Sequence, residues 1–276
     1  MNRRKLEVAV ISDVHLGTYG CHATELVSYL RSISPKLLVL NGDIIDIWQF
    51  KKHYFPASHM QVIKEIFGMI AKGTQVVYIT GNHDEMLRRF ADADLGHIHV
   101  RNKMLFTFGG VKTWIFHGDI FDASIQNARW LAKLGGWSYD LLIWVNRWLN
   151  VLLERMGREK YSLSKTIKDS VKKAVKYVGD FEVAAAEMAV RKGYGRVICG
   201  HIHQPQQRII QVGDQQIEYL NSGDWIENLT ALEWDGTAWS LYQHPDVRDL
   251  EEDDEKVDAS ARHLLSMLLN EADSDE

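Results

Sequence analysis

The chain has 276 residues, of which 46% are hydrophobic and 25% charged, a composition typical of a globular protein. No apolar run approaches the roughly 18 residues of a membrane span, residues 8–11 are too short for a signal peptide, and two cysteines are too few for a disulfide framework, so a cytoplasmic protein is expected. The net charge of −5 is concentrated in residues 246–276, and the mildly basic remainder suits an anionic ligand but is too weakly basic for a nucleic-acid partner.

Short apolar runs of the β type recur along the chain, bounded by Gly, Asn and Asp. They are residues 6–11, 37–40, 75–80, 113–116, 196–199, 218–221, 230–234 and 239–242. Helix-length segments at 23–33 and 60–71 separate the first three runs, and this strand–helix–strand order predicts an α/β sheet. The last three runs follow one another closely and are expected to be antiparallel strands.

Residues 125–195 contain no strand pattern and are expected to be helical throughout. Apolar residues recur there at helical spacing, and the segment has 13 Lys and Arg against 7 Asp and Glu. It also contains four of the nine tryptophans, Trp130, Trp137, Trp144 and Trp148. We interpret it as a helical cap inserted into a core formed by residues 1–124 and 196–245. Residues 246–276, with 12 acidic and 3 basic side chains, are predicted to be a solvated acidic C-terminal tail.

Side chains that commonly bind metal ions follow five of the apolar runs. They stand in the segments D-V-H at 13–15, N-G-D at 41–43, G-N-H-D at 81–84, H-G-D at 117–119 and G-H-I-H at 200–203. Ligands of an open α/β sheet lie at the carboxyl ends of its strands. Five strand ends are therefore expected to deliver Asp, His and Asn side chains to one edge of a sheet.

The residue types at this edge predict a centre of two divalent ions. Carboxylate, imidazole and amide groups without a thiolate suit Mn²⁺, Fe²⁺, Zn²⁺ or Mg²⁺. Two such ions can clamp the attacking and leaving oxygens of a phosphoryl transfer and make hydroxide available near neutral pH. A bridging carboxylate is needed to hold two cations close together, and Asp43 is the candidate.

The ordered series D-x-H, G-D, G-N-H-D, H-G-D and G-H-x-H resembles the calcineurin-like metallophosphoesterase superfamily, from residue 6 to about residue 245. The resemblance implies an α/β fold of the four-layer α/β/β/α sandwich type. It assigns Asp13, His15 and His203 to a first metal ion. It assigns Asn82, His117 and His201 to a second ion, with Asp43 between the two. His83 matches the catalytic histidine of the family, and Asp84 is expected to orient it.

Within this superfamily the chain is similar to the UDP-2,3-diacylglucosamine hydrolases of lipid A biosynthesis in length, in its H-G-D motif and in the position of its insertion. This similarity implies Mn²⁺ as cofactor and cleavage of the substrate to UMP and 2,3-diacylglucosamine 1-phosphate. It implies a lipid-binding cap and peripheral contact with the cytoplasmic face of the inner membrane. Ser162, Ser164, Lys165 and Lys168 fall where the cap binds the diphosphate and sugar. One departure is His83, where the best-known members have Arg.

Other interpretations remain open from the sequence. The tryptophan-rich face is equally consistent with core packing or a dimer interface, and the cap lysines with a solvated helix face. The same metal centre could serve a phosphodiesterase or phosphatase that acts on another nucleotide or phospholipid, or the fold could be a non-catalytic scaffold. The other histidines match no motif and are expected in packing or at the surface: His22, His53, His59, His97, His99, His244 and His263.

Overall fold

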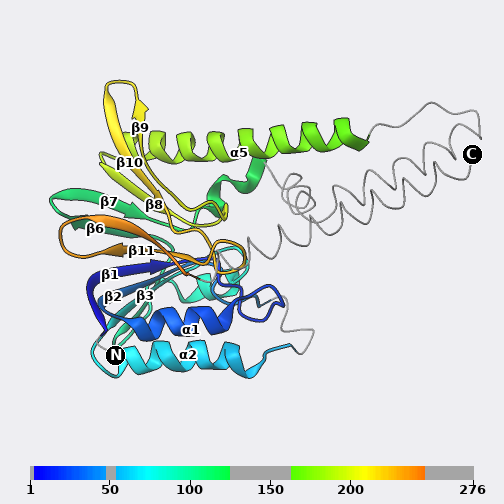
Figure 1. The fold of residues 1–276 in the computed structure, drawn as a ribbon. Helices are drawn as coiled ribbons and strands as arrows, with labels where there is room; N and C mark the ends of the chain where they lie inside the picture. Colours follow the sequence, from blue (N-terminus) through cyan, green and yellow to red (C-terminus); the bar gives the residue numbers. More distant parts are fainter. Residues whose placement is uncertain (1–2, 48–53, 125–162, 246–276) are drawn as a thin grey trace, which may run out of the picture.

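The computed structural model describes residues 3–47, 54–124 and 163–245; for residues 122–124 and 163–175 it describes the backbone alone. The described chain forms four layers (Figure 1). Two helices, α1 (Ala23–Ser32) and α2 (Ala57–Ile70), cover a larger sheet. A smaller sheet lies on the other side of the larger one, and α5 (Leu163–Arg191) covers it. The α/β/β/α sandwich expected from the motifs is therefore confirmed.

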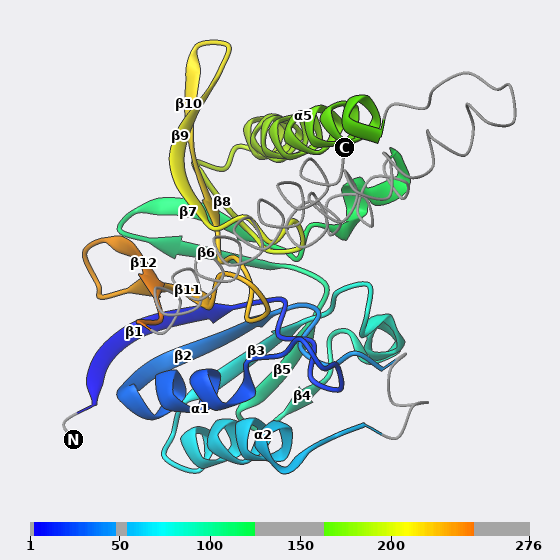
Figure 2. The ribbon, with the colours of Figure 1, turned by 45° about the vertical axis from the view of Figure 1, so that its right-hand side comes forward.

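The larger sheet has seven strands in the order β12-β11-β1-β2-β3-β5-β4 (Figure 2). Its parallel strands are β1 (Arg4–Ile11), β2 (Ile33–Asn41), β3 (Gln75–Ile79) and β5 (Ile98–Arg101). Its antiparallel strands are β4 (Asp94–Leu95), β11 (Thr230–Trp234) and β12 (Trp239–Gln243). The carboxyl ends of β1, β2 and β3 thus lie side by side.

The smaller sheet has five strands in the order β6-β7-β8-β10-β9. Its parallel strands are β7 (Val111–Ile115), β8 (Arg196–Cys199) and β10 (Gln215–Asn221). Its antiparallel strands are β6 (Met104–Phe108) and β9 (Gln206–Val212). The prediction of antiparallel strands at the end of the core is right for β11 and β12. It holds only in part for β10, which pairs with β9 in antiparallel and with β8 in parallel.

Three apolar clusters hold the layers together. Strand β1 shows how one strand serves two of them: Ala9 and Ile11 pack toward α1 and α2, whereas Val8 and Val10 pack between the two sheets. This alternation follows from the two-residue period of a strand. The third cluster lies between the smaller sheet and α5 and includes Phe181. Both faces of β1 are buried in its carboxyl half, where residues 8–11 form a continuous apolar run.

The expected cap is described only in part. Residues 163–191 are helical, as predicted, and form α5. Residues 125–162, with the four tryptophans, lie outside the described residues, as does the acidic tail at 246–276. The boundaries of core, cap and tail therefore stay predictions. None of the described helices has the length and apolar character of a membrane span.

Candidate metal centre

The predicted ligands follow the carboxyl ends of five strands that belong to two sheets. Asp13 follows β1 and Asp43 follows β2, both in the larger sheet. His117 follows β7 and His201 follows β8, both in the smaller sheet. The expectation of a single sheet edge is therefore wrong: the candidate ligands meet at the seam where two stacked sheets end.

Most of these residues have backbone torsion angles that only a small fraction of non-glycine residues adopt. The φ angles lie between 51° and 71° for Asp13, His15, Asp43, His201 and His203. Such left-handed conformations cost free energy and cluster at functional sites. These five residues lie in the turns after three strands, β1, β2 and β8, and the turns bring short side chains from different strands to one point.

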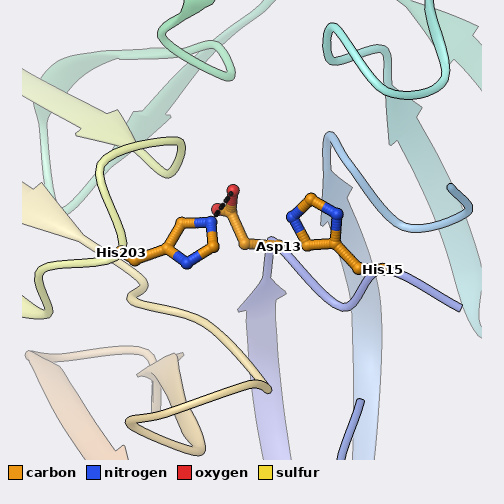
Figure 3. Close-up of side chains that lie close together, drawn as sticks. All are labelled: Asp13, His15 and His203. Atoms are coloured by element: carbon orange, nitrogen blue, oxygen red, sulfur yellow. Dashed lines mark ion pairs between the residues drawn. The ribbon is translucent and has the colours of Figure 1, made fainter. Parts of the chain in front are cut away.

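Three groups of side chains have ligand atoms within 4.8 Å of one another. They are Asp13 with His15 and His203, His15 with Asp43 and His83, and Asp43 with His117 and His201. Figure 3 shows the first group, in which the Asp13 carboxylate lies between the rings of His203 and His15. The groups share members, so together they form one continuous centre.

Asp43 lies between the two predicted ligand sets. Its Oδ2 atom is 3.2 Å from Nε2 of His117, on the side of the second set, and 3.9 Å from Nε2 of His15, on the side of the first. Its Oδ1 atom accepts a hydrogen bond from the backbone N–H of His83 at 2.8 Å. The carboxylate is thus held in place by one oxygen, while the other faces both sets.

Several buried atoms of the centre make no hydrogen bond of regular geometry. They are Asp13 Oδ1, His15 Nε2, Asp43 Oδ2 and Asn82 Oδ1. Buried polar atoms are normally paired, because an unpaired one costs about 1–3 kcal/mol. Asp13 Oδ1 and Asp43 Oδ2 lie 3.2 Å from Nε2 of His203 and of His117 without an aligned hydrogen bond. Ligand-type atoms that converge in this way in both predicted sets fit a site built for cations.

Neighbouring positive charges lower the pKa values of the two central carboxyl groups. Burial alone would raise the pKa of Asp13, but the charges of His203 and His117 lower it below the usual value. Burial would likewise raise the pKa of Asp43, but His117 lowers it. Both carboxylates are therefore ionised at neutral pH and available to cations.

The pKa of His117, which lies beside these carboxylates, is shifted upward. Burial alone would lower the pKa of His117, but Asp43 and Asp13 raise it to about 10. Its Nδ1 lies 2.9 Å from the backbone carbonyl of Asn41 and donates to it, so Nε2 faces Asp43. Metal ligation requires the neutral imidazole, so a cation here would displace the proton from Nε2.

The hydrogen bonds around His83 differ from the expectation. Nδ1 of His83 lies 3.1 Å from Oδ2 of Asp46, so Asp46 is the carboxylate that orients this ring. Asp84 instead accepts hydrogen bonds from the N–H groups of Gly81 and Ile44 and from the hydroxyl of Tyr78. The predicted contact of Asp84 with His83 is therefore wrong, because this buried carboxylate fixes the backbone of the loop.

The predicted substrate-binding residues lie at one end of α5, away from what the structure describes in side-chain detail. Ser164, Lys165 and Lys168 lie at the start of α5, and their side chains, like the whole of Ser162, lie outside the described residues. Two neighbours of the centre had no interpretation from the sequence, Asp46 and the ion pair of Arg88 with Asp119. The spacing of Asp46, three residues after Asp43, was the one signal available for it.

A family model of calcineurin-like phosphoesterases matches residues 6–205. The chain belongs to this family. A relative from Aliivibrio fischeri named UDP-2,3-diacylglucosamine hydrolase is 24% identical over 249 residues, which are 86% of this chain and 98% of the relative. A protein of the same name from Xanthomonas campestris is 24% identical over 241 residues, covering 84% and 97%. The solved structure of a novel archaeal phosphodiesterase covers 86% of this chain and 98% of its own, at 13% identity and a TM-score of 0.38.

Family membership gives the centre its general chemistry. This phosphoesterase is a metal-dependent phosphoester hydrolase, and its family implies divalent metal ions. The clusters around Asp13, Asp43 and His117 are the part of the described chain that could hold them.

Proposed function

We propose that two divalent metal ions, Mn²⁺ in the cell, bind at the seam between the sheets. Asp13, His15 and His203 hold the first ion. Asn82, His117 and His201 hold the second, and Asp43 binds both. The observation that carries this proposal is the group of buried ligand-type atoms without an aligned hydrogen bond, because a single ion would not explain such oxygens in both ligand sets.

When bound, the ions supply Lewis acidity and a water of lowered pKa for attack on phosphorus. Asp43 lies between the two groups of ligands and would therefore determine where the two metal ions sit. His83 is the candidate proton donor to the leaving oxygen. Its side chain is one-third exposed at the edge of the centre, and Asp46 holds Nδ1, which leaves Nε2 available to a substrate.

The proposed reaction is hydrolysis of the diphosphate of UDP-2,3-diacylglucosamine to UMP and 2,3-diacylglucosamine 1-phosphate. The names of the relatives support it, and they cover most of this chain. The basic, tryptophan-rich sequence of residues 125–195 supports a cap that binds acyl chains at the membrane surface, with Ser164, Lys165 and Lys168 near the diphosphate. We place the protein at the cytoplasmic face of the inner membrane.

A second candidate is a phosphodiesterase or phosphatase acting on another nucleotide or phospholipid. The observation in its favour is His83, which stands where the best-known hydrolases of lipid A biosynthesis have Arg. A soluble substrate would make activity indifferent to detergent and liposomes.

The test is phosphorus NMR of the Mn²⁺-loaded protein with UDP-2,3-diacylglucosamine in detergent. Appearance of UMP and a sugar 1-phosphate supports the proposed reaction. An unchanged spectrum together with hydrolysis of bis(p-nitrophenyl) phosphate would refute this substrate and keep the centre. The Asp43→Ala variant is the control: it should lose both metal and activity, and an active variant would refute the mechanism.

A further inference from the structure

An ion pair crosses the seam next to the second ligand set. Arg88 lies in the short helix η2 (Glu85–Phe90), which follows β3 of the larger sheet. Asp119 begins η3 (Asp119–Ser124), which follows β7 of the smaller sheet. The guanidinium of Arg88 donates to the Asp119 carboxylate and, at 3.4 Å, to the backbone carbonyl of Gly81. The side chains are 40% and 12% exposed.

The Arg88–Asp119 pair lies close in the chain to two predicted ligands of the second ion, Asn82 and His117. Arg88 contacts Gly81, the residue before Asn82, and Asp119 lies two residues after His117. Asn82 comes from the larger sheet and His117 from the smaller one. The second ion therefore depends on the spacing between two loops that different sheets carry.

The other hydrogen bonds of the first loop stay within the larger sheet. Asp84 binds Gly81, and Asp43 and Asp46 bind His83. Among the hydrogen bonds and ion pairs of the described residues, the Arg88–Asp119 pair is the one that joins residues 81–90 to the loops of the smaller sheet.

We propose that Arg88 is a positioning residue for the second metal ion: through Asp119 it fixes the spacing between the loop of Asn82 and the loop of His117. This inference rests on the proposed two-metal centre. An ion pair with a 40% exposed guanidinium contributes little to global stability, about 0–1 kcal/mol, so its main effect is expected on the metal and not on folding. Removal of groups that orient metal ligands lowers metal affinity roughly 10–100-fold.

Electrostatics alone predicts a different pattern from positioning. Arg88→Ala removes a positive charge near the cations, so a purely electrostatic effect would strengthen metal binding. Asp119→Asn removes a negative charge and would weaken metal binding. In the double variant the two electrostatic effects would largely cancel. Positioning predicts that each single variant weakens the second site and that the double variant is no worse than either one, because both remove the same contact.

The experiment is calorimetric titration of the metal-free full-length protein with Mn²⁺, with electron paramagnetic resonance to distinguish coupled pairs from single ions. We expect Arg88→Ala and Asp119→Asn to bind the first ion normally and the second roughly 10–100-fold more weakly. Arg89→Ala is the matched control, since the contacts of Arg89 with described residues, the carbonyl of Met86 and the ring of Phe90, lie within its own helix. Arg88→Lys should restore part of the loss.

Unchanged or tighter binding of the second ion in Arg88→Ala would overturn the inference. The inference would also be overturned if Asp119→Asn weakened binding of the second ion and the added Arg88→Ala substitution restored it. A wild-type protein that binds fewer than two Mn²⁺ ions would instead refute the proposed centre itself, so the two failures are distinguishable. Thermal unfolding of the metal-free variants shows whether either substitution has disturbed the fold.

Discussion

Two neighbouring carboxylates near His83 have different tasks, and substitution separates them. Asp46 contacts Nδ1 of His83 at 3.1 Å, so Asp46→Asn should leave the ring poorly oriented. We expect kcat to fall roughly 10–100-fold. Because Asp46 Oδ2 also lies 3.8 Å from Nδ1 of His15, the affinity for the first ion should fall as well. Asp84→Asn should instead lower the melting temperature, because its carboxylate accepts three hydrogen bonds and loses at least one, at about 1–3 kcal/mol. Metal content, kcat and thermal unfolding of both variants test this assignment, and equal kcat losses at equal stability would contradict it.

His59 holds the loop at Gly17, beside the first ligand set, and we expect this contact to be sensitive to acid. Its Nδ1 accepts the backbone N–H of Gly17 at 2.9 Å, and burial lowers its pKa below the ordinary 6.5. The folded state therefore favours the neutral ring, so the contribution of His59 to stability is complete above pH 6.5 and falls as the pH drops below it. Protonation also removes the acceptor for Gly17.

The measurement is the melting temperature of the metal-free protein between pH 8 and pH 5. We expect His59→Leu to be less stable than the wild type at pH 8, since the Gly17 N–H loses its partner, by about 1–3 kcal/mol. The difference in stability between the wild type and His59→Leu should shrink as the pH falls. Protonation of the buried imidazole destabilises the wild type and has no counterpart in the variant. Parallel curves for the two proteins would contradict the assignment.

The sequence singled out candidate ligands that the structure brings close together, since each stands in a short motif directly after an apolar run. It did not show which carboxylate orients His83. Asp84 is adjacent in the chain, but the turn after β3 directs its side chain to the backbone N–H groups of Gly81 and Ile44. Asp46 reaches the same ring from another strand end, and such proximity depends on the fold.

At the scale of elements, helix α5 contacts the metal centre through one tight junction. Gly118 has a φ of 127°, and a Cβ atom there would lie 2.8 Å from the ring of Phe181 on α5 and 3.1 Å from Cβ of His201. Gly118→Ala should therefore displace either α5 or His201. We expect a loss of about 1–3 kcal/mol in stability and weaker binding of the second ion.

Gly110→Ala is the matched control for Gly118→Ala. Gly110 also has a positive φ, of 79°, but a Cβ atom added there would have no neighbour within 4 Å, so only backbone strain is added. Thermal unfolding and Mn²⁺ titration of both variants measure the difference. Equal effects on metal binding would show that the junction with α5 has no influence on the centre.

Among the described strands, the apolar runs did not predict β5, β6 and β9. Strand β9 (Gln206–Val212) is an edge strand with exposed polar residues, and β5 (Ile98–Arg101) has no fully buried residue. The parallel pairing of β10 with β8 was also missed. Closeness in sequence favours antiparallel pairing, whereas here β9 lies at the sheet edge and β10 takes the place beside β8.

At the scale of the whole molecule, the centre lies on a seam between two sheets. Local sequence patterns place a ligand after a strand, but they carry no information on which sheet the strand joins. The resemblance to a known family supplied that arrangement, and the structure confirms it. The second ion takes its proposed ligands from both sheets, so the fold's packing of sheet on sheet determines the metal geometry.

The most direct test of the two-metal account is anomalous X-ray diffraction from crystals of the protein grown with Mn²⁺. The account predicts two peaks about 3.5–4 Å apart, with the Asp43 carboxylate between them and Asp13 and His117 on opposite sides. Crystals of Asp43→Ala should lose at least one peak. A single peak in the wild type, or peaks away from these three residues, would contradict it.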